Sequence, residues 1–370
     1  MGLTAGPVPA RVDASVKAGV LVLIDHAVSC GWSARAACDA IGLDHMRAAR
    51  WAERRDADRL EDLPPGGHPV HGLLDWERAA IVALHAQWGE RDRSHRKLAH
   101  RGSYLERVWV SESTVRKVLS EEGLVLPGNP PREPIPRTPW PDWLEWKPNR
   151  VWGYDFTHFT RAKRCAVAII DIVSRKWITT LVSAEESSIQ VEVAFTEALE
   201  VEDLWAAADQ RATAALVTAL ASGDSEALES VLGHGQRPLL LAISDNGPQM
   251  RSHTTREFLA GVAIAQQFGR PGTPQDQAWI ETLFGHVKSE WPHLEKITDP
   301  GELAAELDLA RADYNGIRLH AGLQYVTPND EHEGRGDAIR AKRRNGLAQA
   351  RENRIAYRRT TDGAHHGENQ

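Results

Sequence analysis

Three acidic residues, Asp155, Asp245 and Glu281, have the surroundings and spacing in which carboxylates could do chemistry together. Asp155 lies among Trp, Tyr and Phe residues, where an ionised carboxylate without a partner would be costly. Thirty-five residues lie between Asp245, which follows an apolar run, and Glu281. Carboxylates suit Mg²⁺ or Mn²⁺, and two such ions about 3.5–4 Å apart can activate the attacking oxygen and stabilise the leaving oxygen of a phosphodiester. The three acids are therefore our candidates for catalysis and for metal binding.

Each of these acids also has an ordinary structural interpretation. Asp155 could be a strand carboxylate paired with Lys or Arg. Asp245 could be a turn residue, since Asp-Asn-Gly is a common turn sequence, and Glu281 could be favoured by the dipole at a helix N-terminus. Taken alone, Asp245 fits the turn better, but the three acids together favour metal binding. For Asp171, another acid in an expected strand, we favour a structural role.

Apolar patterns and turn signals predict the elements that must position these acids. After residue 149 we expect strands over 151–159, 165–173 and 177–182, a helix over 187–204, a strand over 238–244, a helix over 254–259, a strand over 263–268 and a long helix from about residue 276. Three antiparallel strands followed by alternating helices and strands predict an α/β fold with a mixed sheet covered by helices. An acid at the carboxyl end of a strand, such as Asp245, points to where open α/β sheets bind ligands.

The first third of the chain is helical in pattern and predicts two all-α helix-turn-helix domains, over 1–63 and 68–126. In the second, Ser111 can cap a short helix that exposes Thr114, Arg116 and Lys117. A short cationic helix after a tight turn is the recognition element of a helix-turn-helix and can lie in the major groove of DNA. An ordinary small helical bundle with a charged surface is the alternative for both domains.

Proline content and charge divide the rest of the chain. Eight prolines between residues 127 and 148 predict a semi-rigid linker over 127–147, ahead of a core over 148–330. Residues 184–232 hold eleven acidic residues and one basic residue, and this acidic segment continues through about 200–235. Residues 335–359 hold nine basic residues and two acidic ones, in a basic tail over 331–370 that could bind phosphates or be a solvated end.

Composition excludes several classes of protein. The formal net charge of −7 argues against nucleic-acid binding by the chain as one body, but it averages opposed patches, and local patches decide what is bound. Three cysteines without a Cys-x-x-Cys pair argue against a disulfide framework and a zinc finger. The sequence shows no signal peptide and no run long enough to span a bilayer, so we expect a cytoplasmic protein without a membrane partner.

Beyond the spacing of the acids, four groups of residues resemble the DDE transposases and retroviral integrases, in particular bacterial insertion-sequence transposases. These are Ser33–Cys38 with Gly42, Leu43 and Trp51; Ser244–Gly247; Pro274–Glu281; and Tyr314-Asn315 with Arg318, His320, Leu323 and Thr327-Pro328. The resemblance covers roughly residues 30–330. The sequence departs from the family in the long interval between Asp155 and Asp245, which looks like an acidic insertion at about 200–235, and in Gln277 and His158.

The resemblance implies an RNase H-like catalytic core in which Asp155, Asp245 and Glu281 hold two Mg²⁺ or Mn²⁺ ions. It implies a DNA transposase of bacterial, nucleoid-associated type that binds double-stranded DNA at the terminal inverted repeats of its element and in the target. A homo-oligomer, a dimer or larger, would hold both ends, and Lys288, seven residues after Glu281, would contact DNA. A DNA-binding regulator without catalysis and a nuclease that never joins strands are the alternatives.

Overall fold

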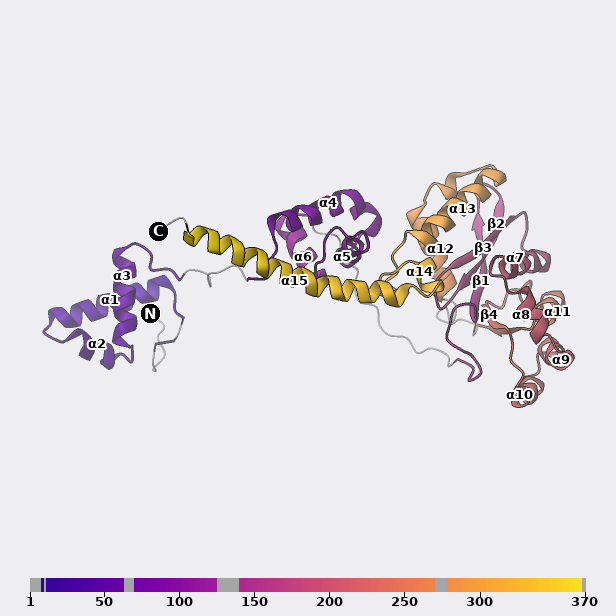
Figure 1. Ribbon diagram of the computed structural model, residues 1–370, viewed down its shortest axis with the longest axis horizontal. Helices are drawn as coiled ribbons and strands as arrows, with labels where there is room; N and C mark the ends of the chain where they lie inside the picture. Colours follow the sequence, from indigo (N-terminus) through magenta and orange to yellow (C-terminus); the bar gives the residue numbers. More distant parts are fainter. Residues whose placement is uncertain (1–7, 10, 63–69, 125–139, 270–277, 368–370) are drawn as a thin grey trace. The chain divides into compact units, whose positions relative to one another are not determined.

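The computed structural model describes residues 8–9, 11–62, 70–124, 140–269 and 278–367, with side chains described up to residue 360 (Figure 1). Contacts divide the chain into two units, Met1–Gly72 and Leu73–Gln370. Three sequence features used or expected above lie outside the described residues: most of the proline-rich linker, residues 274–277 of the third acid's motif, and the boundary between the two helical domains.

The first unit consists of three helices, α1 (Ala14–Ser29), α2 (Ala34–Ala40) and α3 (His45–Asp56). Ser33 caps α2 by accepting a hydrogen bond from the amide of Ala36, and Asp44 caps α3 in the same way from Arg47. Short polar side chains at these positions satisfy amides that have no partner inside the helix. Apolar residues from all three helices, including Leu21, Cys38 and Trp51, form the core of this unit.

The second unit begins with another three helices, α4 (Asp75–Asp92), α5 (His95–Tyr104) and α6 (Glu112–Glu121). Ser111 caps α6, since its hydroxyl accepts from the amide of Thr114 at 3.1 Å. Val115, Val118 and Leu119 turn inward into a separate small core. The expected helix and its apolar face are confirmed, and its binding of DNA stays a prediction.

A five-stranded mixed sheet follows, in the order β3-β2-β1-β4-β5. Its strands are β1 (Val151–Phe159), β2 (Arg164–Asp171), β3 (Trp177–Ser183), β4 (Leu240–Ser244) and β5 (Ile264–Phe268). The strands β1, β2 and β3 pair antiparallel, whereas β4 lies parallel to both β1 and β5. The mixed α/β sheet and the RNase H-like fold are therefore confirmed.

Helices cover both faces of the sheet (Figure 1). On one face lie α7 (Ser188–Val201) and α11 (His253–Gly261), and on the other lie α12 (Ala278–Glu290) and α13 (Pro300–Gly316). Side chains alternate along a strand, so Trp152, Tyr154 and Phe156 pack towards α7 while Phe159 packs towards α12. Asp155 shares the alternation of Phe159 and is therefore on the α12 face.

The acidic insertion forms three short helices between α7 and β4: α8 (Trp205–Arg211), α9 (Ala214–Ser222) and α10 (Ser225–Gly233). Ala208 and Leu216 are buried in the core on the α7 face, so the insertion is part of the folded domain. In the described part of the chain, none of the carboxylates on these three helices forms an ion pair with a basic side chain.

Two short helical turns and two further helices complete the second unit. These are η2 (Leu294–Lys296), η3 (Ala321–Leu323), α14 (Pro328–His332) and α15 (Gly336–Gly367). The basic segment is thus mostly one helix of 32 residues, and several of its arginines bond within the chain. Arg354 forms an ion pair with buried Glu77 at 2.7 Å, and Arg343 donates to the carbonyls of Ala99 and Val110. No described helix has the length and apolar character needed to cross a membrane.

Candidate active site

The pairing of β1 with β4 places two of the three acids beside each other. Gly153 of β1 lies opposite Ile243 of β4 in parallel register. Asp155 and Asp245 each come two residues after this pair, so they reach the same level of the sheet on the same face. The sequence could suggest that both acids end up near strand ends, but only the register shows that they are neighbours.

Each aspartate has one oxygen in a backbone hydrogen bond. Oδ1 of Asp155 accepts from the amide of Phe156 at 2.8 Å, and Oδ1 of Asp245 accepts from the amide of Gly247 at 2.9 Å. The turn interpretation of Asp245 is therefore correct for one oxygen, since this contact is an Asx turn. Asn246 donates to the carbonyl of Gly269 at 2.6 Å and so ties the same turn to the end of β5.

Asp155 carries an unusual proton affinity because of its surroundings. Burial, together with the nearby charges of Asp245, Glu186 and Glu281, raises the pKa of its carboxyl group to about 7. Within the described ranges Asp155 has no ion pair with Lys or Arg, so the structural interpretation as a paired strand carboxylate is not supported. A half-buried acid among like charges is the arrangement expected where a cation is to be bound.

Glu281 lies in the first turn of α12 with an exposed side chain. The start of this helix is held through Trp279, whose ring lies 5.7 Å from Trp140 and beneath the Arg175 guanidinium at 5.6 Å. Leu283 and Val287 lie farther along the same helix. Those two do pack against β2, but Trp279 lies in a separate cluster with Trp140, next to Ile243.

The three acids supply carboxylate oxygens, which are the ligand atoms that Mg²⁺ and Mn²⁺ prefer. In the part of the chain that the structure describes, no Lys or Arg side chain forms an ion pair with them, so their negative charges are not balanced by a basic group. In the described residues no group of three or more His, Cys, Asp or Glu side chains is placed to hold a metal ion. The register thus brings Asp155 beside Asp245, and the described acids do not form a closed ligand set.

A fourth carboxylate, Glu186, belongs to this site and escaped our sequence analysis. It lies between the end of β3 and the start of α7, where it pairs with the imidazole of His158 at 3.1 Å. The amide of Gln249 donates to its other oxygen at 3.2 Å. Its only sequence signal is its place just after a strand, which is too weak to have singled it out.

Lys288 lies on the side of α12 that faces β1. Its amine donates to the carbonyl of His158 at 3.1 Å and pairs with Glu295 at 3.0 Å. The side chain remains 38% exposed, so it can exchange these partners for another anion.

The other proposed DNA contacts are on α6, away from the acids in the sequence. Lys117 is 77% exposed and lies 3.8 Å from Glu121. Arg116 is exposed, and it has no partner in the part of the chain that the structure describes. Thr114, which we expected to be exposed, is half-buried, and its hydroxyl lies 2.7 Å from that of Ser111.

Asp171, for which we favoured a structural role, and residues of the last family motif form contacts within the fold. Asp171 is fully buried and accepts hydrogen bonds from the amides of Asn149 and Ser174. Tyr314 bonds to His320 at 2.8 Å, and Arg318 pairs with Glu290 at 2.9 Å.

Comparison with known proteins gives a consistent result. The Integrase core domain family matches residues 262–328, a range that contains Glu281 but neither aspartate. The transposase for insertion sequence element IS904 of Lactococcus lactis subsp. lactis is 25% identical over 186 residues, which are 50% of this chain and 61% of that relative. This chain therefore spans less than two thirds of the length of the curated relative.

Among solved structures, similarity extends to three retroviral proteins. The catalytic core domain of BIV integrase is 20% identical with a TM-score of 0.32, covering 50% of this chain and 94% of that one. The HTLV-2 integrase catalytic core domain in complex with magnesium, in its dimeric form, is 20% identical with a TM-score of 0.33 (50% and 97%). The simian T-cell lymphotropic virus intasome with PP2A regulatory subunit B56 gamma is 16% identical with a TM-score of 0.37 (69% and 74%). Scores of this size do not by themselves establish a relationship.

Proposed function

We propose that this protein, a member of the superfamily of DDE transposases and retroviral-type integrases, is a DNA transposase that cuts the ends of its element and joins them to target DNA. The observation that carries the proposal is the register that sets Asp155 beside Asp245, with Glu281 near enough to raise the pKa of Asp155. A purely structural role would not require two aspartates on one face of the sheet and a glutamate on the helix that covers it to lie near one another without a basic partner.

In this proposal Asp155, Asp245 and Glu281 hold two divalent cations. Mg²⁺ or Mn²⁺, when bound, would lower the pKa of the attacking water or hydroxyl and neutralise charge on the leaving oxygen. Asp155 must give up its proton to act as a ligand, because only the carboxylate binds a hard cation. Glu186 adds a fourth negative charge near Asp155 and pairs with the imidazole of His158.

The reaction has two steps. Water first hydrolyses a phosphodiester at the element end, so that one P–O bond forms, the bond to the 3′-oxygen breaks, and the 3′-hydroxyl is freed. That hydroxyl then attacks a target phosphodiester, and its oxygen replaces the target's 3′-oxygen on phosphorus. Both steps exchange one P–O bond for another, so neither an external energy source nor a covalent enzyme intermediate is needed.

The test is strand transfer by the full chain with a labelled element-end duplex in Mg²⁺ or Mn²⁺, and again with EDTA. We expect joined products that require the metal and disappear in Asp245→Asn. Asp209→Asn is the matched control, since Asp209 is an exposed acid on α8. Strand transfer retained in a folded Asp245→Asn protein would refute the metal-ligand role. Cleavage without joined products would indicate a nuclease, and binding without cleavage would indicate a regulator.

We further propose that Thr114, Arg116 and Lys117 on α6 contact the element end, and that Lys288 contacts DNA beside the acids. Replacing Arg116 and Lys117 by Ala should weaken binding of the duplex and lower its dependence on salt, because each lost phosphate contact removes one released counterion. Lys288→Ala should leave that binding nearly unchanged and reduce strand transfer. The two sets of variants are each other's control. We also propose a dimer or larger assembly on DNA, which would appear as a complex containing two labelled ends.

A further inference from the structure

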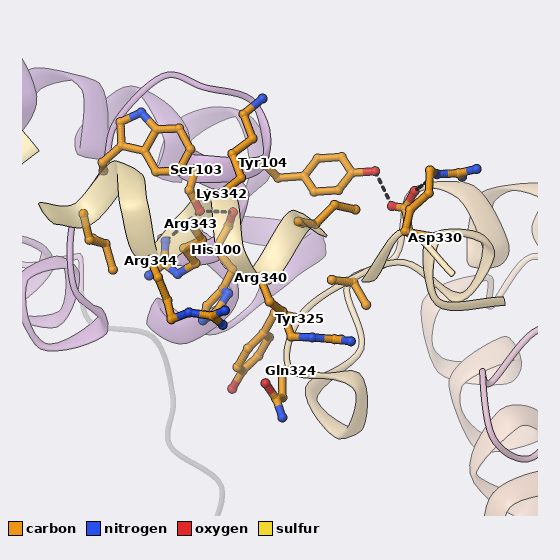
Figure 2. Close-up of a pocket in the computed structure, with 15 residues that line it drawn as sticks. His100, Ser103, Tyr104, Gln324, Tyr325, Asp330, Arg340, Lys342, Arg343 and Arg344 are labelled. Atoms are coloured by element: carbon orange, nitrogen blue, oxygen red, sulfur yellow. Dashed lines mark hydrogen bonds and ion pairs between the residues drawn. The ribbon is translucent and has the colours of Figure 1, made fainter. Parts of the chain in front are cut away.

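A pocket of about 450 Å³ lies where α15 passes α5 and the turn at residues 324–326 (Figure 2). Its volume is within the range of sites that hold small molecules, about 300–1,000 Å³. None of the acids of the candidate active site lines it. The chain therefore has a second concave site that the proposed cleavage and joining do not use.

Aromatic rings form one wall of the pocket. The rings of His100 and Tyr325 lie 4.3 Å apart between their centroids, and Tyr104 and Trp109 also line the space. The backbone that carries Tyr325 has an uncommon conformation, because Tyr325 and Gln324 both have positive φ angles, of 64° and 55°. Non-glycine residues in this conformation carry a free-energy cost and are found preferentially at functional sites.

The cations around the pocket fall into two groups. Arg335, Arg340 and Lys342 have carboxylate partners. The other two, Arg343 and Arg344, do not.

Arg343 donates only to uncharged groups: the Ala99 carbonyl, the Val110 carbonyl and the Ser103 hydroxyl. The nearby carboxylate of Glu112 is bonded instead to His100 at 3.2 Å and paired with Arg96 at 3.4 Å. Arg344 is exposed, and it has no partner in the described part of the chain. Two positive charges on α15 are thus left beside an aromatic wall (Figure 2).

We propose that this pocket binds a single nucleotide, with its base against the His100–Tyr325 pair and its phosphate between Arg343 and Arg344. Bases stack on Tyr, His and Trp rings, and guanidinium groups bind phosphate through paired hydrogen bonds, so a nucleotide uses both halves of the pocket. A simple anion would leave the aromatic wall without a partner, and an apolar ligand would leave the two arginines unused. The source is either an unpaired nucleotide of a DNA strand or a free nucleotide, which share this chemistry.

This inference rests on the proposed function only in naming a DNA strand as one possible source of the bound nucleotide. Its test therefore uses binding and not strand transfer. The full chain is titrated with a labelled decathymidylate, with dTMP and with inorganic phosphate, and dTMP is also used as a competitor. We expect the oligonucleotide or dTMP to bind, and inorganic phosphate to bind at least about tenfold more weakly, because stacking of one base contributes about 1–3 kcal/mol.

Two variants locate the binding. Arg344→Ala should weaken it about tenfold, and so should Tyr325→Ala, since loss of a charged hydrogen bond or of stacking costs about 1.5–3 and 1–3 kcal/mol respectively. Arg351→Ala, which removes an equivalent exposed arginine of α15 outside the pocket lining, should not weaken it. Tyr325→Phe should keep most of the affinity, because the ring is retained. The chemical shift of His100 in the NMR spectrum should move on binding in the parent protein, and in Arg344→Ala it should move only at about tenfold higher ligand concentration.

Each outcome of these titrations assigns the pocket to one source of the nucleotide or overturns the proposal. Binding of the oligonucleotide but not of dTMP, lost in both variants, assigns the pocket to a DNA strand; competition by dTMP assigns it to a free nucleotide. Binding that is unchanged in Arg344→Ala and Tyr325→Ala, or equal for inorganic phosphate, overturns the proposal. Asp245→Asn should bind like the parent protein, so loss of strand transfer in that variant leaves this result unaffected.

Discussion

Replacing Asp155 by Asn should stabilise the metal-free protein at alkaline pH while abolishing strand transfer. Asp155 has a pKa of about 7 in the folded protein instead of its ordinary 3.8, chiefly because it is buried and also because three other carboxylates are near. The folded chain therefore holds a proton that the unfolded chain has lost between these two pH values. Folding stability falls as pH rises through this window, and above about pH 7 the ionised acid opposes folding in full.

The magnitude follows from the size of the pKa difference. A change from 3.8 to about 7 corresponds to a ceiling of about 4 kcal/mol at 1.36 kcal/mol for each pKa unit. Asp155 is only half-buried, and water and side-chain movement screen its charge. We therefore expect Asp155→Asn to raise the free energy of unfolding by about 1–3 kcal/mol at pH 8. Asn can still accept the hydrogen bond from Phe156, so no backbone contact need be lost.

The assay is thermal unfolding of the full chain and of the variant, in EDTA, at pH 8 and at pH 4. The melting temperature of Asp155→Asn should exceed that of the parent by several degrees at pH 8, since 1 kcal/mol shifts a domain of this size by about 2–4 °C. The two proteins should converge at pH 4, and the surface control Asp209→Asn should show no such pH-dependent gain. A variant that is less stable than the parent at pH 8, or equally shifted at both pH values, would show that Asp155 is not held in an unfavourable charged state.

Three further outcomes are expected. Mn²⁺ should raise the melting temperature of the parent protein more at pH 8 than at pH 6, because the cation must displace the proton of Asp155; equal shifts would contradict this. Trp140→Ala should lower strand transfer about tenfold with the fold retained in circular dichroism, because Trp140 packs on Trp279 at the start of the helix that carries Glu281. Gly346→Ala should lower the free energy of unfolding by about 1–3 kcal/mol, since a Cβ there would overlap ring carbons of Trp109; Gly285→Ala, in a helix where a Cβ would meet nothing within 4 Å, is the matched control and should not lower it.

The sequence predicted most of the fold because its elements follow local rules. The strand over 151–159 was obtained with its observed ends, and Ser111 caps the helix that its side chain suggested. Local patterns cannot give the pairing of β1 with β4, since parallel strands far apart in the sequence leave no short-range signal. The proximity of Asp155 to Asp245 was therefore an expectation from resemblance and spacing until the register was known.

Long-range contacts explain what sequence analysis missed. Glu186 is one of several acids after β3, and only the folded chain brings it to His158 and Gln249. The basic segment was expected as a tail because its charge suggested solvent or phosphate as a partner. Arg354 instead meets the buried carboxylate of Glu77, a residue 277 positions away. Charge composition alone does not show whether a basic side chain will find its anion within the chain or outside it.

The parallel register between β1 and β4 limits where this chain can change in length during evolution. Inserting one residue into either strand ahead of its acid would turn that carboxylate to the opposite face, because side chains alternate along a strand. Residues added between α7 and β4 leave the pairing unchanged, and the entropy of closing a connection rises only slowly with its length. The three helices α8, α9 and α10 occupy this connection. Lineages of such proteins should therefore vary freely in the distance from the first aspartate to the second, and hardly at all in the few residues that precede each one.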